Sequence, residues 1–331
     1  MFKDNKLLSK LQSVNELTIL SIIVVFVILI SIKSPVFLTT DNIVTTAMGL
    51  STTSIVGIGV TIALIGGCFD LSVGSIMGLS SVLTVLFAQK GINIWIAVLL
   101  SMIICVSIGT LSGILVGKFN LNGFITTFAI SQMARGLVFV LTEGFSITLP
   151  GGNEGFRVLG TGKLFQSLPI MILIFLSMAI IADICVRKTS IIKRVFYVGS
   201  SEKAAVLSGI NSGNVKVFLY IGTATMSAIA GILSVSRFGV ATANNGNGVD
   251  MMVLSAAVIG GTSLGGGKGT ILGTTLGIVM LSIMNNALVL FNISVNWQNF
   301  VSGAILLIAI VIDYISNRQQ TMKKSNRRKT V

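Results

Sequence analysis

The feature that most constrains this chain is a series of long apolar segments that carry almost no charge. Residues 17–32, 94–116, 168–186 and 300–315 are apolar over about the length that a helix needs to cross the hydrocarbon core of a membrane. A buried helix of a soluble protein is the alternative, but so many such segments in one chain argue against it. Only 10% of the 331 residues are charged, against about a quarter in soluble domains. We therefore expect an integral membrane protein.

Length and hydropathy divide the chain into about ten membrane segments of an all-α, polytopic protein. The first segment is expected to be retained, because Lys33 and Pro35 stand where a secretory signal would carry small residues. A transmembrane domain over 17–316 would then lie between an N-terminal segment, 1–16, and a basic tail, 317–331. The expected spans are 17–34, 43–66, 71–89, 93–117, 121–142, 167–187, 214–236, 250–264, 269–291 and 298–316.

Basic residues indicate the orientation of the chain. The net charge is +13, and the basic residues gather at segment ends, not on a face interleaved with aromatic residues, which favours the positive-inside rule over nucleic-acid binding. An even number of spans places both termini on one side, and Lys3, Lys6, Lys10 and the cluster from Arg318 to Lys329 make that side cytoplasmic. Residues 186–216, which hold six Lys and Arg, are expected on the same side. The loop 143–166 mixes both charges and should face outward.

Two glycine-rich segments have similar sequences and interrupt the apolar pattern. IGGCFDLSVGSIMG covers residues 65–78, and IGGTSLGGGKGTILG covers residues 259–273. Glycine costs about 1 kcal/mol relative to alanine in a helix interior, and a broken backbone at membrane depth survives only where protein or a water-filled cavity satisfies it. We expect helix breaks or re-entrant turns at both places, including Gly260 and Gly261. Such pairs, in two related halves, are typical of transport proteins.

Enzymatic and nucleotide-binding functions find little support in the residues. Aligning a Walker A motif on Gly267 and Lys268 puts its opening glycine on Thr262 and its hydroxyl position on Gly269. The chain has no histidine, and its scattered acids do not assemble with a nucleophile and a base. Three cysteines, at positions 68, 105 and 185, lack the paired spacing of metal or redox sites. No catalytic residue, metal site or cofactor of its own is expected.

Polar residues within the apolar segments are candidates for a path through the membrane. Asp70 could line such a path with Ser72 and Gly74, or it could cap a helix by accepting from the amides near Val73 and Gly74; the cap is the favoured interpretation. The other polar residues could line the path or bond neighbouring helices. They are Thr126, Thr127, Gln132, Arg135, Asn285, Asn286, Gln298 and Asn299.

The stretch SSEKAAVLSGI, residues 200–210, predicts a short amphipathic helix capped by Ser200 or Ser201 and ended by Gly209. It stands between basic clusters and precedes a new span, which favours a docking element for a partner protein. An incidental interfacial helix is the alternative.

These motifs resemble those of the membrane permease subunits of bacterial ABC importers for ribose and related monosaccharides. That group includes autoinducer-2 and nucleoside permeases and is more distantly related to branched-chain amino-acid permeases. Residues 66–75 resemble the family motif GG-x-DLSVGS with one extra residue, and residues 124–137 resemble FI-x-TL followed by RGL. Residues 197–210 resemble AIGGN-x-x-AA-x-LSGI, and residues 256–277 are the most specific match. One departure is that Asp250 and Met252 stand where the family usually has Glu and Asp.

The resemblance implies a permease that acts as a homodimer, or as a heterodimer with a similar chain, in the bacterial cytoplasmic membrane. A separate ATPase would bind ATP and magnesium, and a separate extracytoplasmic protein would capture a small hydroxylated solute, most simply a monosaccharide such as ribose. Autoinducer-2 or a nucleoside is the alternative solute; an ion-coupled secondary transporter and a structural or sensory protein are alternatives of other classes. The ATPase-coupling residues implied are Ser201, Glu202, Ala204, Ala205, Leu207, Ser208 and Gly209.

Overall fold

The computed structural model describes residues 4–165 and 167–294 together with 297, 300, 301, 303, 304, 307 and 311, with side chains from residue 16 on. The expected span 298–316, with Gln298 and Asn299, falls largely outside the described residues, as do the tail 317–331, Lys3 and the side chains of Lys6 and Lys10. The described helices are α1 (Asp4–Lys33), α2 (Thr40–Ile65), α3 (Val73–Gln89), α4 (Ile94–Gly117), α5 (Gly123–Thr142), α6 (Glu154–Thr161), α7 (Ile170–Lys188), α8 (Ser190–Ser200), α9 (Glu202–Leu207), α10 (Ser212–Phe238), α11 (Val249–Ile259) and α12 (Ile271–Leu290).

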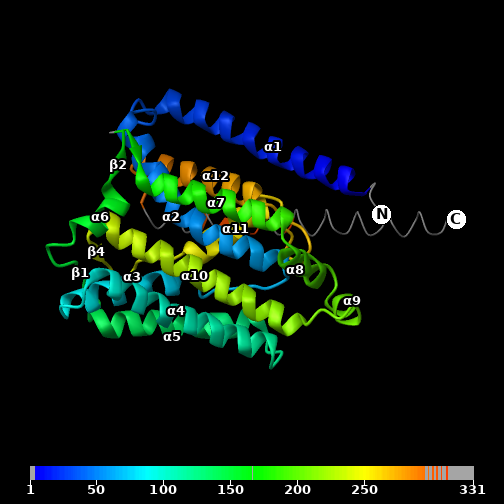
Figure 1. Ribbon diagram of the computed structural model, residues 1–331. Helices are drawn as coiled ribbons and strands as arrows, with labels where there is room; N and C mark the ends of the chain where they lie inside the picture. Colours follow the sequence, from blue (N-terminus) through cyan, green and yellow to red (C-terminus); the bar gives the residue numbers. More distant parts are fainter. Residues whose placement is uncertain are drawn as a thin grey trace.

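Seven of the described helices are long and apolar enough to cross a membrane: α1 over residues 16–33, α2, α4, α5, α7, α10 and α12. They run side by side along the long axis of the bundle (Figure 1). Helices α3 and α11 are shorter, with 17 and 11 residues, and α11 ends at the glycine pair where a helix break is expected. Helix α1 begins at Asp4, so it extends into the segment 1–16 that hydropathy separates from the first span.

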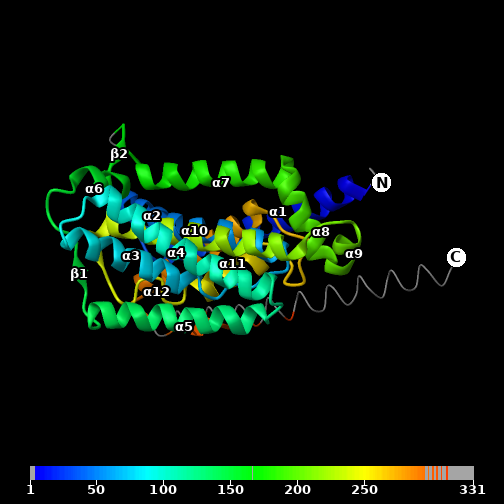
Figure 2. The ribbon, with the colours of Figure 1, turned by 60° about the horizontal axis from the view of Figure 1, so that its bottom comes forward.

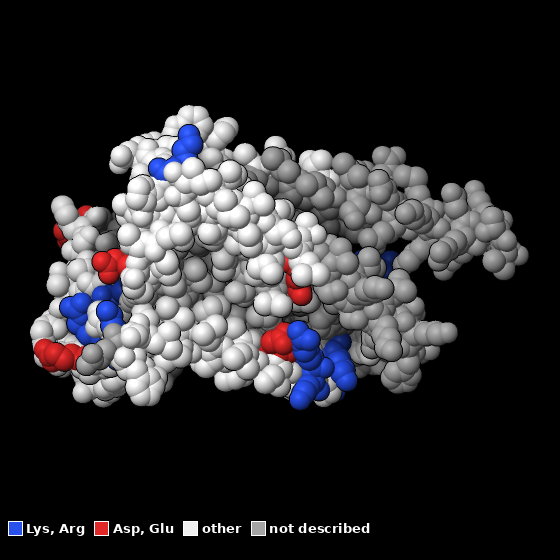
Figure 3. All heavy atoms as spheres, turned by 90° about the horizontal axis from the view of Figure 1, so that it is seen from above, with Lys and Arg blue, Asp and Glu red and all other residues white. Residues whose placement is uncertain are grey.

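The two ends of the bundle carry different structures. Helices α8 and α9 lie at one end, and α6 and the short strands lie at the other (Figures 1 and 2). Strand β1 (Ile147–Thr148) pairs antiparallel with β4 (Val240–Ala241), and β2 (Lys163–Leu164) pairs antiparallel with β3 (Leu168–Pro169). In the view of Figure 3, charged side chains gather toward the two ends and leave an uncharged band between them. This distribution is that of a protein whose middle is surrounded by lipid.

Helix α10 packs against α2, α3 and α4 and forms the centre of the bundle. Three glycines of α4, spaced by four residues, let the two backbones approach: Gly109, Gly113 and Gly117. An added Cβ at Gly113 would lie 2.7 Å from the Cα of Val217, and one at Gly117 would lie 2.5 Å from the Gly213 carbonyl oxygen. Small residues at this spacing favour close helix packing in membranes, where burial from water does not drive association.

Two helix ends have the same glycine cap, at the two glycine-rich segments that the sequence singles out. Helix α2 ends in Gly66 and a left-handed Gly67 (φ +74°), and α11 ends in Gly260 and a left-handed Gly261 (φ +85°). Beyond each pair, the next amide bonds a carbonyl five residues back, from Cys68 to Ala63 and from Thr262 to Ala257. Both ends are thus Schellman motifs, in which only glycine adopts the left-handed conformation without strain. A non-helical segment and a further helix follow each: α3 after the first, α12 after the second.

Candidate translocation core and coupling surface

Polar contacts centred on Asp70 hold the segment that joins α2 to α3. Its Oδ1 accepts hydrogen bonds from the Ser72 amide at 2.9 Å and the Ser72 hydroxyl at 2.5 Å, and its Oδ2 accepts one from the Thr223 hydroxyl of α10. The residue before α3 is Ser72, whose side chain makes no capping bond. The interpretation of Asp70 as a cap for the amides near Val73 and Gly74 is therefore wrong. Its buried carboxylate instead forms a turn two residues earlier and ties that turn to α10.

Neighbouring helices satisfy the exposed backbone groups of the same segment. The Tyr220 hydroxyl of α10 donates to the Phe69 carbonyl at 3.0 Å, and the Leu71 amide donates to the Thr127 hydroxyl of α5 at 3.1 Å. One turn along, the hydroxyls of Ser75 and Ser131 lie 2.8 Å apart. Protein groups therefore stabilise the helix break, as broken backbone at membrane depth requires. The predicted residue Thr127 takes part in this support.

A second irregular segment, residues 242–248, lies between β4 and α11. The Arg135 side chain of α5 donates from Nη1 to the carbonyls of Ala243, at 3.1 Å, and Asn245, at 2.7 Å. Arg135 therefore organises backbone that no helix satisfies. Sequence analysis missed this segment. Its sequence, TANNGNG, is rich in Asn and Gly, which is typical of a turn between apolar segments.

The starts of α3 and α11 meet inside the bundle. Gly74 and Gly246 approach so closely that a Cβ on either would overlap the carbonyl oxygen of the other. A Cβ at Gly74 would also lie 3.5 Å from the Asp250 amide nitrogen, in the first turn of α11. Asp70 bonds Thr223 near the middle of α10, so this meeting point lies well within the depth of the bundle. Two helix N-termini, each with a positive dipole end, thus lie together with Asp70, Asp250 and Arg135 around them.

The remaining predicted path residues do not join this core as one cluster. Asn286 of α12 exchanges two hydrogen bonds with Asn42 of α2, at 2.8 and 3.1 Å, which is the helix-bonding role weighed as the alternative. Asn285 is half-buried on the same helix, as is Thr126 on α5. Gln132 lies on the exposed side of α5.

The coupling segment contains the expected short helix. Ser201 precedes α9 and accepts a hydrogen bond from the Ala204 amide at 3.3 Å, and Gly209 ends the turn with φ +80°. Glu202 pairs with Lys216 of α10 at 2.6 Å. The hydrogen bond from the Lys216 ammonium lowers the pKa of Glu202 below its ordinary value. Ala205 is buried, whereas Leu207 is 90% exposed, so α9 presents an uncovered apolar side chain at the end of the bundle.

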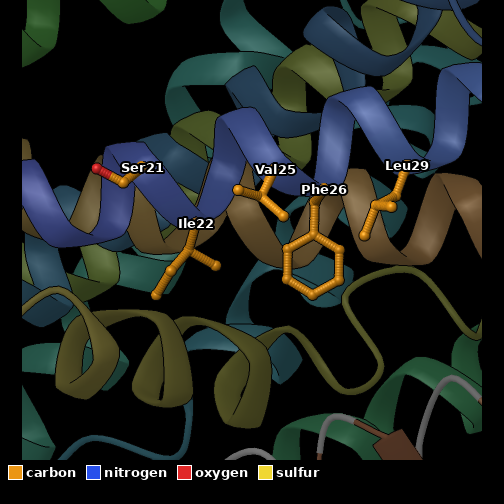
Figure 4. Close-up of a pocket in the computed structure, with 5 residues that line it drawn as sticks. All are labelled: Ser21, Ile22, Val25, Phe26 and Leu29. Atoms are coloured by element: carbon orange, nitrogen blue, oxygen red, sulfur yellow. The ribbon is translucent and has the colours of Figure 1, made fainter.

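One surface hollow lies away from this core. It is an apolar groove of about 230 Å³ along α1, and Figure 4 shows its five lining residues on one helix. Ile22, Val25 and Leu29 among them are exposed, and the Ser21 hydroxyl donates to the Leu17 carbonyl one turn earlier. A groove formed by a single helix at the edge of the bundle is a lipid-facing surface and offers a solute no enclosing walls.

Broken helices that meet at depth, in a bundle of membrane-spanning helices, define a multi-pass membrane protein of the transporter class. The comparison with known families agrees. The chain belongs to the family described as "Branched-chain amino acid transport system / permease component", which it matches over residues 42–310. Members of this family are transport subunits and not themselves enzymes.

Several curated relatives are similar over most of their length. The ribose import permease protein RbsC of Bacillus subtilis is 35% identical over 289 residues, which cover 87% of this chain and 89% of the relative. RbsC of Escherichia coli K12 is 30% identical over 295 residues, covering 88% and 91%. The L-arabinose transport system permease protein AraH of Escherichia coli K12 is 32% identical over 294 residues, covering 88% and 89%. No solved structure matches the chain significantly.

Proposed function

We propose that this chain is the membrane permease subunit of an ABC importer that carries a monosaccharide, such as ribose, into the cytoplasm. The observation that carries the proposal is the match to ribose and arabinose permeases over almost the whole chain. The paired helix breaks support it, because such breaks in related halves are a feature of transport machinery.

The ATPase partner is proposed to dock on α9. Leu207 is the apolar contact, and the Glu202–Lys216 ion pair holds the helix against α10. The implied docking set is Ser201, Glu202, Ala204, Ala205, Leu207, Ser208 and Gly209. The ATPase would bind ATP and magnesium, and hydrolysis would change which side of the membrane the permease opens toward, because a partner shifts conformers by its differential affinity for them.

The end that carries α8 and α9 is proposed to be cytoplasmic. Its basic residues support this orientation under the positive-inside rule; they are Arg187, Lys188, Lys193, Arg194 and Lys203. Both termini would lie on this side of the bacterial cytoplasmic membrane, with 1–16 and 317–331 flanking the domain 17–316. A solute-binding protein would dock at the opposite end, near α6 and β1. A second permease chain, identical or similar, would complete the transporter.

The core where α3 and α11 meet is the proposed translocation region. The positive dipole ends of two helix starts, together with the polar groups of Asp70, Asp250 and Arg135, offer both donors and acceptors to hydroxyl groups. Ser72 and Gly74 shape the helix break beside it, and Gly260 and Gly261 shape the break at the other end of α11. An ion-coupled secondary transporter has a weaker basis, because Asp70 already accepts three hydrogen bonds from Ser72 and Thr223.

Uptake into vesicles tests the proposal. The chain is reconstituted with and without an ATPase and a binding protein encoded beside it, and labelled pentoses, hexoses, autoinducer-2 and nucleosides are offered. ATP-dependent uptake of a pentose or hexose only with both partners supports the monosaccharide importer. Uptake of autoinducer-2 or a nucleoside reassigns the solute, and uptake by the chain alone under an ion gradient overturns the proposal.

A further inference from the structure

Three separate parts of the chain meet backbone to backbone at Gly199, near the C-terminus of α8. They are the end of α2 at Ile65, the end of α8, and the glycine-rich turn 262–270 that follows α11. The Gly267 amide donates to the Ile65 carbonyl at 2.8 Å, which joins the first and third parts directly. Gly199 lies against this bond, because an added Cβ there would overlap the Ile65 oxygen and lie 2.8 Å from the Gly267 nitrogen.

Other glycines complete the contact on both sides. A Cβ at Gly67, in the first helix break, would lie 3.7 Å from the Gly199 Cα. A Cβ at Gly266, in the second turn, would lie 2.6 Å from the Gly199 oxygen. Both glycine-rich segments that interrupt the apolar pattern therefore converge on one residue of α8. We call the set Gly67, Gly199, Gly266 and Gly267 the glycine junction.

An apolar cluster on one side and an ion pair on the other hold the glycine junction in place. Val195 of α8 is buried in an apolar cluster with Ile65 of α2 and Leu219 of α10. On the other side, the chain passes from Ser200 into α9, which the Glu202 ion pair fastens to α10. Backbone segments that pack directly against one another, without side chains between them, cannot move independently. A displacement of α8 is therefore transmitted to the end of α2 and to the turn 262–270.

We propose that Gly199 is a positioning residue for transport, at which the coupling segment and the cytoplasmic ends of both helix breaks are held together and move as one body. The inference rests on the proposed function, since it takes α9 as the place where the ATPase acts. A push on α9 would reach both breaks at once through this single contact. Gly266 and Gly267, in the turn that partly resembles a nucleotide-binding loop, pack against Gly199 and Ser200 at the end of α8.

The test replaces Gly199 with alanine in the complete complex and measures solute molecules imported per ATP hydrolysed. The residue lies in a helix where alanine is a better former than glycine, so the backbone conformation permits the change. The added methyl must instead separate Ile65 from α8. We expect ATP hydrolysis to continue and the transport ratio to fall at least tenfold. Gly222→Ala in α10 is the matched control, because nothing lies within 4 Å of its added Cβ.

A disulfide provides a second measurement that remains decisive should Gly199→Ala fail to assemble. An added Cβ at Gly267 would lie 3.2 Å from the Ser200 Cβ, close to the separation that a disulfide spans. The pair Ser200→Cys and Gly267→Cys, in a Cys185→Ala background, is compared before and after reduction, so that the strain of a cysteine at the left-handed Gly267 (φ +74°) is common to both forms. Unchanged uptake in the oxidised form supports movement as one body. Loss of uptake that a reductant restores, or normal coupling in Gly199→Ala, overturns the proposal. A native complex without ATP-dependent uptake would instead refute the proposed function.

Discussion

Replacing Asp70 with alanine should destabilise the protein severely, because the carboxylate accepts three hydrogen bonds that hold the first helix break. Bonds to a charged group contribute about 1.5–3 kcal/mol each, and a donor left unsatisfied costs about 1–3 kcal/mol. The Thr223 hydroxyl can turn to the Tyr220 carbonyl, which lies 3.0 Å away, so part of the loss is recovered. We expect the free energy of unfolding to fall by about 3–5 kcal/mol, a large fraction of the total for a typical domain.

Asp70→Asn separates a supporting role from a role in transport. An asparagine oxygen can still accept from Ser72, and its amide can donate to the Thr223 oxygen while Thr223 donates to Tyr220. Thermal unfolding in detergent should therefore place Asp70→Asn near the native protein and Asp70→Ala far below it, and uptake should survive in the former. The control is Asp183→Asn, whose pairing with Arg187 at 2.7 Å is exposed and contributes about 0.5 kcal/mol or less.

Either of two results would refute this reasoning. Native stability in Asp70→Ala would mean that the hydrogen bonds do not hold the break. A stable Asp70→Asn without uptake would mean that the acid itself acts on the path, as an ion-coupled transporter requires.

Three further substitutions test other contacts. Arg135→Leu should lower unfolding stability by about 2–4 kcal/mol, because it leaves the carbonyls of Ala243 and Asn245 without their charged donor; Arg135→Lys should restore part of it in the same melt. Leu207→Glu should weaken co-purification of the ATPase at least tenfold with membrane insertion unchanged. Glu202→Gln should lower uptake per ATP hydrolysed at both pH 7 and pH 5, whereas the native ratio should be equal at the two pH values. The reason is that the hydrogen bond from Lys216 holds the pKa of Glu202 below its ordinary value, so the ion pair is intact at both pH values and is lost only as the pH falls through the lowered pKa.

Each of these has a result that would count against it. Equal melting of Arg135→Leu and the native protein would show that residues 242–248 hold their conformation unaided. A Leu207→Glu chain that retains the ATPase would move the docking surface away from α9. A native ratio that drops between pH 7 and pH 5, but not in Glu202→Gln, would indicate that Glu202 titrates in that interval.

Local patterns were sufficient to predict most of the helices. Apolar length marks α2, α4, α5, α7, α10 and α12, because a lipid-facing helix must be apolar over its whole crossing. The cap at Ser201 and the stop at Gly209 follow from bonds within one turn, so the sequence also predicts α9. The hydropathy of α11 resembles that of a full span, yet residues 242–248 enter the bundle without helix because Arg135, distant in sequence, satisfies their carbonyls.

The sequence by itself determines the class of this protein, because its composition and the length of its apolar segments are those of a polytopic membrane bundle. Its two similar glycine-rich segments also determine the two equivalent helix ends. Only the tertiary structure decides what the polar residues do. Asp70 binds Thr223, and Asn286 binds Asn42, across sequence separations of 153 and 244 residues that no local pattern encodes. The meeting of Gly67, Gly199 and Gly267 is of the same kind. It depends on how three segments pack, and packing follows from the shape of the whole bundle.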